Sequence, residues 1–135
     1  MGENNNYKEL IEKAKGAMEN AYAPYSDFKV GAALLSKDGK IYTGCNIENA
    51  AFGPSNCAER TAIFKAVSEG VRDFEAIAIV GGKAGAIEDF CPPCGVCRQV
   101  MSEFCDKDFR IVLEGKDGAQ KTFTLGELLP ESFSL

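Results

Sequence analysis

The chain has 135 residues, of which 45% are hydrophobic and 26% charged, and its net charge is −5. These values are typical of one globular domain over 1–135, and they predict neither a nucleic-acid partner, which needs a cationic surface, nor a membrane partner. The absence of histidine excludes Ser-His-Asp triads, Cys-His nucleophile pairs and histidine zinc sites. The polar start, Met1–Asn6, predicts no secretory signal, so we expect a cytoplasmic protein.

Periodicity and turn signals predict the elements of the first half of the chain. Apolar residues at helical spacing predict a helix over Tyr7–Tyr22. Two strands, Phe28–Ser36 and Ile41–Cys45, flank Asp38-Gly39, a pair that strongly favours a hairpin turn. The segment Asn46–Asn56 has no period and is expected to be an irregular loop.

The second half alternates between helical and extended patterns. The expected elements are a helix over Cys57–Glu69, a strand over Phe74–Val80, a loop over Gly81–Pro93, a helix over Cys94–Phe104, strands over Phe109–Leu113 and Lys121–Thr124, and a short helix over Leu125–Leu129. A strand–helix–strand–helix–strand run predicts a parallel sheet with right-handed crossovers, to which the opening hairpin adds an antiparallel strand. We therefore expect an α/β protein, a three-layer α/β/α sandwich with one mixed five-stranded sheet.

The six cysteines are Cys45, Cys57, Cys91, Cys94, Cys97 and Cys105. Three disulfides are arithmetically possible, but the absence of a secretory signal and a chain long enough to form a core favour free thiols. Cys45, in an apolar strand, and Cys105, at the end of a helix pattern, are interpreted as buried small residues.

The remaining cysteines predict a metal site at one edge of the sheet. Cys57 begins the first crossover helix, and Cys94 and Cys97 begin the second, so neighbouring strands are expected to bring these sulfurs together. Helix N-termini stabilise thiolates, and three thiolates suit a zinc site that keeps an open position. Glu59 is then a candidate proton carrier.

Less specific interpretations of the same residues stay open. Cys57 and Cys91 could complete a closed four-cysteine structural site with Cys94 and Cys97, or the C-x-x-C units could form a redox pair. Glu59 could simply be an acid in the first turn of a helix.

Cys57-Ala58-Glu59 followed by Pro93-Cys94-Gly95-Val96-Cys97 resembles the motif of the zinc nucleoside deaminases. The all-cysteine set is similar to that of the small homotetrameric cytidine deaminases, and 23–33, 44–50 and 128–130 resemble that family too. The resemblance implies hydrolytic deamination of cytidine and deoxycytidine to uridine and deoxyuridine, in which a zinc-bound hydroxide attacks C4 of the base and ammonia leaves.

The resemblance also implies roles at the metal. Cys57, Cys94 and Cys97 would bind one Zn²⁺ per chain, and Glu59 would move protons between the water, ring N3 and the leaving amine. Arg60 would hydrogen-bond the cysteine ligands and draw charge away from them.

Other matching residues would hold the nucleoside. Asn46 and Glu48 would bind ribose hydroxyls, Phe28 would pack against the pyrimidine, and the backbone N–H of Ala58 would contact a base oxygen. Phe133 would enter the site of a neighbouring subunit in a homotetramer. Because Glu48 would repel a phosphate, nucleosides are favoured over nucleotides as substrates.

Three further readings compete with this assignment. Cys91-Pro92-Pro93-Cys94 places a rival ligand, Cys91, before the motif. A related enzyme type deaminates the nucleoside antibiotic blasticidin S, although Glu48 suits an ordinary ribose better. A non-catalytic, zinc-stabilised interaction module is the alternative from a different functional class.

Overall fold

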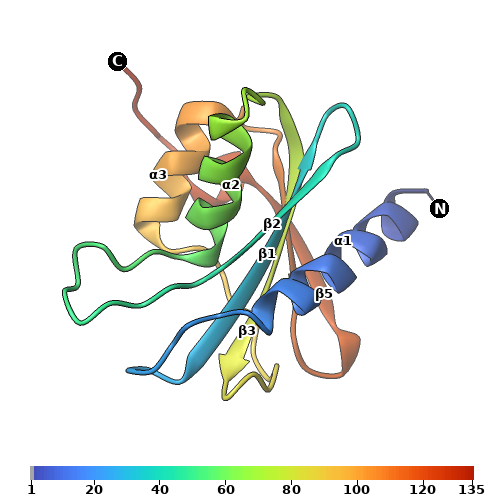
Figure 1. Ribbon diagram of the computed structural model, residues 1–135. Helices are drawn as coiled ribbons and strands as arrows, with labels where there is room; N and C mark the ends of the chain where they lie inside the picture. Colours follow the sequence, from blue (N-terminus) through green and yellow to red (C-terminus); the bar gives the residue numbers. More distant parts are fainter. Residues whose placement is uncertain (1) are drawn as a thin grey trace.

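The structure, a computed structural model, describes residues 2–135, with side chains from Tyr7 onward, and is built around one five-stranded sheet (Figure 1). Its elements are α1 (Gly2–Met18), β1 (Phe28–Ser36), β2 (Ile41–Cys45), α2 (Ala58–Ser68), β3 (Phe74–Lys83), α3 (Gly95–Phe104), β4 (Arg110–Glu114), the 3-10 turn η1 (Lys116–Gly118), β5 (Gln120–Thr124) and α4 (Leu125–Leu128). The two strands predicted for the hairpin, Phe28–Ser36 and Ile41–Cys45, are β1 and β2 with the same bounds.

The sheet is mixed, with strand order β2-β1-β3-β4-β5. β1 pairs antiparallel with both β2 and β3, β3 pairs parallel with β4, and β4 pairs antiparallel with β5. The expectation that the strands before the two crossover helices are neighbours is wrong, because β1 lies between β2 and β3. Those two strands nevertheless run in the same direction, so α2 and α3 begin at the same edge of the sheet.

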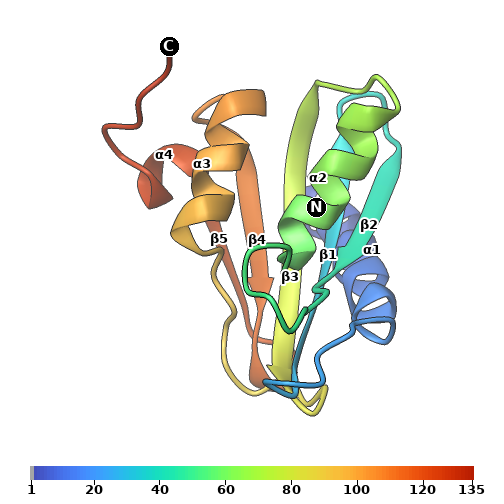
Figure 2. The same ribbon diagram turned by 60° about the vertical axis from the view of Figure 1, so that its left-hand side comes forward.

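Helices cover both faces of the sheet, which confirms the three-layer α/β/α sandwich (Figure 2). α1 buries Leu10, Ile11 and Ala14 against one face. α2 and α3 pack side by side on the other face, where Ile63 and Met101 are fully buried. Burial of apolar side chains on both faces is the main force that holds these layers together.

α1 ends at Met18, four residues before the predicted end. The chain extends after this helix because Tyr22 forms a parallel bridge with Ile47. The Tyr22 N–H donates to the Asn46 carbonyl at 3.0 Å, and the Glu48 N–H donates to the Tyr22 carbonyl at 2.8 Å. Pairing with a distant segment thus overrides the local helical pattern and orders the chain at Asn46–Glu48.

The start of α2 lies close against β2. A Cβ atom on Gly44 would stand 2.5 Å from the backbone nitrogen of Ala62 and 2.6 Å from the carbonyl oxygen of Ala58. Only glycine permits this approach, which seats the first turns of α2 on the sheet. The position of Cys57 and Glu59 at that helix end therefore depends on a glycine one element earlier.

All six cysteines are free thiols. Cys105 is partly buried, and burial raises the pKa of its thiol to about 12; burial also raises the pKa of Cys45. Among residues 2–135, no helix combines the length and apolar character needed to cross a membrane.

Candidate metal centre and active site

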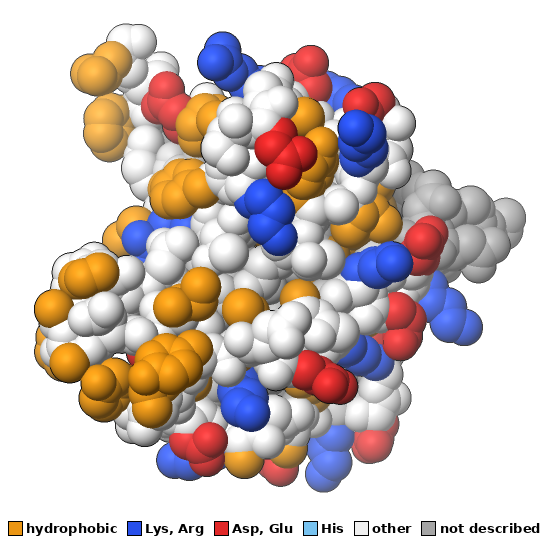
Figure 3. All heavy atoms as spheres, viewed as in Figure 1, with side chains coloured by type: hydrophobic (Ala, Val, Ile, Leu, Met, Phe, Trp, Pro, Cys, Tyr) orange, Lys and Arg blue, Asp and Glu red, His pale blue; other side chains and the backbone are white. Residues whose placement is uncertain are grey.

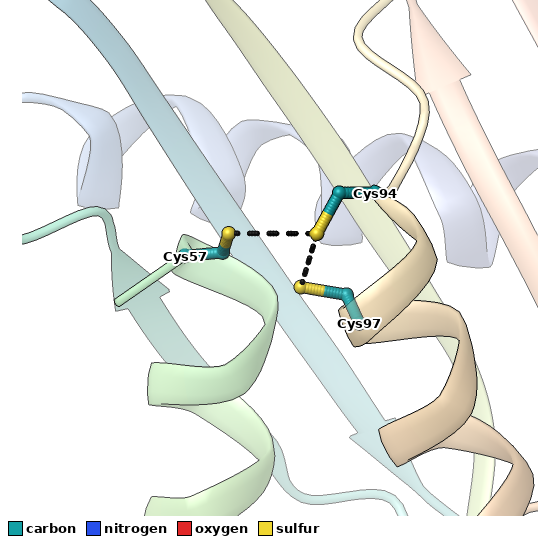
Figure 4. A group of neighbouring side chains, drawn as sticks. All are labelled: Cys57, Cys94 and Cys97. Atoms are coloured by element: carbon teal, nitrogen blue, oxygen red, sulfur yellow. Dashed lines mark hydrogen bonds between the residues drawn. The ribbon is translucent and has the colours of Figure 1, made fainter. Parts of the chain in front are cut away.

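Three sulfur atoms converge where α2 and α3 begin (Figure 4). The Cys57 Sγ lies 3.8 Å from the Cys94 Sγ, which lies 3.5 Å from the Cys97 Sγ, and all three are within 4.8 Å of one another. Thiolates bound tetrahedrally to one zinc ion would lie about 3.8 Å apart, given the usual zinc–sulfur distance. The spacing and chemistry of this donor set therefore fit zinc.

The backbone of both helix starts turns these thiols toward one another. Cys57 is the N-cap of α2 and Cys94 the N-cap of α3, and both residues have extended backbone angles. Neither side chain caps its own helix, so each sulfur stays available as a ligand. The unpaired N–H groups at both helix ends stabilise negative charge on the sulfurs.

Arg60 supplies positive charge to this cluster. Its Nη2 donates to the Cys57 Sγ at 3.3 Å, while its Nε is buried without a hydrogen-bond partner among the described residues. The pKa of Cys57 falls to about 5, because the Cys97 thiol, and then Arg60, hydrogen-bond to the Cys57 sulfur. A guanidinium held here is suited to a group of negatively charged sulfurs.

Glu59 lies in the first turn of α2 and is only 4% exposed. Burial raises the pKa of its carboxyl group to about 7, and the nearby charge of Cys57 adds to the effect. A carboxyl group with a pKa near neutrality can both accept and release a proton. Glu59 is thus placed to carry protons beside the sulfur cluster.

Cys91 lines the same pocket but is not part of the three-sulfur cluster. Burial raises the pKa of its thiol to about 12, and the charges of Glu59 and Cys57 add to this. Among the described residues, the donor group therefore contains three thiols, and the closed four-cysteine alternative lacks its fourth sulfur.

A pocket of about 450 Å³ opens beside the cysteines. Its lining contains seven of the predicted site residues, Asn46, Glu48, Cys57, Ala58, Glu59, Arg60 and Cys94, and the rival ligand Cys91. Sequence reasoning missed Phe52, Ser55 and Asn56, which also line it. The one feature of the sequence that could have identified them is their position in the loop between Glu48, a predicted ribose-binding residue, and Cys57.

Asn46 and Glu48 hold the chain at the start of β1 against the pocket. The Asn46 Oδ1 accepts from the Val30 N–H at 2.9 Å, and its Nδ2 donates to the Phe28 carbonyl at 2.8 Å. Glu48 accepts from the N–H groups of Tyr25 and Ser26 and from the Ser26 hydroxyl, which lowers the pKa of its carboxyl group. Both side chains thus position this wall of the pocket.

Three predicted site residues lie outside the lining of this pocket: the buried ligand candidate Cys97 and the substrate-binding candidates Phe28 and Phe133. Phe28 is 40% exposed and lines a separate hollow with Gly81 and Lys83. Phe133 is 67% exposed on the C-terminal tail. Hydrophobic side chains also lie open to solvent on the loop after β2, where Phe52 is 91% exposed (Figure 3).

Comparison with known proteins agrees with this geometry. The family model of the cytidine and deoxycytidylate deaminase zinc-binding region matches residues 4–113. The chain is 52% identical over 127 residues to a cytidine deaminase of Sporosarcina psychrophila, covering 94% of this chain and 90% of that protein. It resembles the crystal structure of cytidine deaminase from Burkholderia pseudomallei with a TM-score of 0.86 and 50% identity, over 94% of this chain and 98% of that one. The corresponding values for the Mycobacterium tuberculosis enzyme are 0.79 and 37%, over 96% and 98%. The chain therefore belongs to the cytidine and deoxycytidylate deaminase family.

Proposed function

We propose that this protein is a zinc-dependent cytidine deaminase that hydrolyses cytidine and deoxycytidine to uridine and deoxyuridine with release of ammonia. The observation that carries the proposal is the meeting of Cys57, Cys94 and Cys97 with the buried Glu59 beside one pocket. The relatives named as cytidine deaminases support the same substrate class. The catalytic domain spans the whole chain, 1–135.

Cys57, Cys94 and Cys97 hold the zinc, with one ion per chain. When bound, zinc acts as a Lewis acid that lowers the pKa of water, although three thiolates oppose this by their negative charge. Arg60 and the N-termini of α2 and α3 offset that charge. Glu59 accepts one proton from the attacking water and delivers it to ring N3, then accepts the remaining proton of that oxygen and delivers it to the departing amine.

The nucleoside binds in the pocket between the cysteines and the 46–48 segment. Asn46 and Glu48 bind ribose hydroxyls, and the backbone N–H of Ala58 contacts the base oxygen. This assignment is supported by the place of all three residues in the pocket lining. Phe28 packs against the pyrimidine once substrate is bound, and the Asn46 side chain, which donates to the Phe28 carbonyl, holds the backbone of Phe28 beside the pocket.

The active enzyme is a homotetramer in which Phe133 of one subunit closes the site of its neighbour. The exposure of Phe133, and of Leu135 at the chain end, supports docking of the tail on another chain. Closure would exclude water and strengthen the interactions between Glu59 and the base. We also place the protein in the cytoplasm, in line with six free thiols that a reducing compartment preserves.

The direct test is cytidine hydrolysis by the zinc-loaded protein. Uridine and ammonia should form in equal amounts from cytidine, and deoxyuridine and ammonia from deoxycytidine. Removing the metal with a chelator should abolish turnover, and adding zinc should restore it. A folded, zinc-loaded protein that forms no uridine would contradict the proposal and favour a non-catalytic zinc module.

A further inference from the structure

Arg98 makes two contacts that the proposed chemistry does not use. Its Nε donates to the carbonyl of Pro93 at 2.8 Å, and its Nη1 donates to the carbonyl of Leu128, also at 2.8 Å. Both bonds are partly buried, so they are shielded from competing water. One planar guanidinium thus joins two segments that are far apart in the sequence.

The first contact lies next to a metal ligand. The Pro93 carbonyl belongs to the peptide group that joins Pro93 to Cys94. The orientation of this peptide group therefore sets the position of the Cys94 Cα, from which the side chain projects. Cys94 is the N-cap of α3 and has no side-chain hydrogen bond to that helix. Arg98 lies one turn later in the same helix, and its backbone N–H donates to the Cys94 carbonyl at 2.9 Å. Both the side chain and the backbone N–H of Arg98 therefore hold the Cys94 segment.

The second contact lies at the start of the C-terminal tail. Leu128 ends α4, and carbonyl groups at a helix end lack partners within that helix. α4 packs beside α3, and the tail leaves from this point (Figure 2). The Leu128 carbonyl is held by Arg98, so the direction in which the tail departs depends on the same guanidinium that holds Pro93.

We propose that Arg98 is a positioning residue that couples the Cys94 side of the zinc site to the C-terminal tail. It acts through Cys94 and touches neither substrate nor zinc. The inference rests on the proposed function, in which Cys94 is a ligand and the tail closes a neighbouring site. Its consequence is that displacing α4 loosens the metal, and that loosening the Cys94 segment frees the tail.

Arg98→Met removes both side-chain bonds and should weaken zinc binding roughly 10- to 100-fold, the range for loss of a group that orients a metal ligand. Two measurements need no nucleoside: zinc release to a coloured chelator, and hydrogen–deuterium exchange of residues 129–135. Both should accelerate in Arg98→Met. Arg98→Lys keeps the positive charge but cannot make both hydrogen bonds in the same geometry. Its rates of zinc release and tail exchange should lie between those of Arg98→Met and the parent. The matched control is Arg72→Met, which removes a guanidinium from an exposed position and should behave as the parent.

A second perturbation approaches from the other end of the link. The Thr124 side chain accepts from the Glu127 N–H as the N-cap of α4, so Thr124→Ala should fray α4 and move the Leu128 carbonyl. Thr124→Ala should then accelerate zinc release from the parent protein. Added to Arg98→Met, it should cause no further acceleration, because the bond from Arg98 to the Leu128 carbonyl is already absent. Thr124→Ala alone still tests the coupling if Arg98→Met does not fold.

The outcomes separate this inference from the proposed function. Zinc-loaded parent and Arg98→Met proteins with equal zinc release and tail exchange would overturn the positioning role alone. A change in only one of the two measurements, or additive effects of Thr124→Ala and Arg98→Met, would overturn the coupling. A folded parent protein that binds no zinc would overturn the proposed function and the coupling with it.

Discussion

The guanidinium of Arg60 in α2 donates from Nη2 to the sulfur of Cys57, the N-cap of that helix, at 3.3 Å. Three thiolates around one Zn²⁺ leave a net negative centre, which is a poor Lewis acid. Arg60 counters this because a charged donor withdraws electron density from the sulfur. The start of α2 thus brings a proposed ligand, a proposed proton carrier and a positive charge within four consecutive residues.

Arg60→Gln should fold and lower kcat for cytidine roughly tenfold or more, since a charged hydrogen bond contributes about 1.5–3 kcal/mol. KM should change less, because Arg60 is proposed to act through the metal ligands. Steady-state kinetics on zinc-loaded protein tests this, with Arg60→Lys expected to retain more activity. An unchanged kcat in Arg60→Gln would show that Arg60 does not offset the charge of the cysteine ligands during catalysis.

Metal analysis of single cysteine variants should separate ligands from bystanders. Cys57→Ala, Cys94→Ala and Cys97→Ala should each lose the bound zinc, because each removes one of three converging sulfurs. Cys45→Ala and Cys105→Ala serve as controls and should keep one zinc per chain. Cys91→Ala is the sharpest comparison: it should also keep zinc, and loss of zinc there with retention in Cys97→Ala would overturn the ligand assignment.

Glu59→Gln should fold and keep its zinc but lose nearly all activity. The amide preserves the shape of the side chain but cannot accept a proton, and positioned general acid–base groups contribute roughly 10²–10⁴-fold to rate. Single-turnover measurement of uridine formation, with zinc content determined on the same sample, provides the test. Substantial remaining turnover would show that another group carries the proton.

Free cytosine and cytidine 5′-monophosphate should both be poor substrates. Cytosine lacks the ribose hydroxyls that Asn46 and Glu48 are proposed to bind, and the monophosphate sets a negative group near the Glu48 carboxylate. Comparing kcat/KM for the two compounds with that for cytidine is sufficient. A kcat/KM for the monophosphate equal to that for cytidine would contradict the assignment of Glu48.

The shared site predicts that two inactive chains repair each other. Phe133→Ala should be impaired because every site lacks its closing residue, and Glu59→Gln because every site lacks its proton carrier. Co-expressed mixed tetramers contain some sites with Glu59 from one chain and Phe133 from another, and their activity should exceed that of either variant alone. Verified mixed tetramers without this gain, or a fully active monomer at assay concentration, would contradict the shared-site proposal.

Local chemistry explains what the sequence determined by itself. Phe28–Ser36 and Ile41–Cys45 have their predicted bounds because the Asp38-Gly39 turn and the apolar pattern act over a few residues. The place of Cys57 and Cys94 at helix starts was equally readable.

Long-range pairing decided the rest. Insertion of β1 between β2 and β3 and the end of α1 at Met18 depend on backbone hydrogen bonds between distant segments, which no local pattern encodes. Spacing alone could not choose between Cys91 and Cys97 as partners of Cys94, since each lies three residues from it. The tertiary structure chose Cys97, because the first turn of α3 directs that sulfur toward Cys57 while the chain before α3 leaves Cys91 outside the cluster.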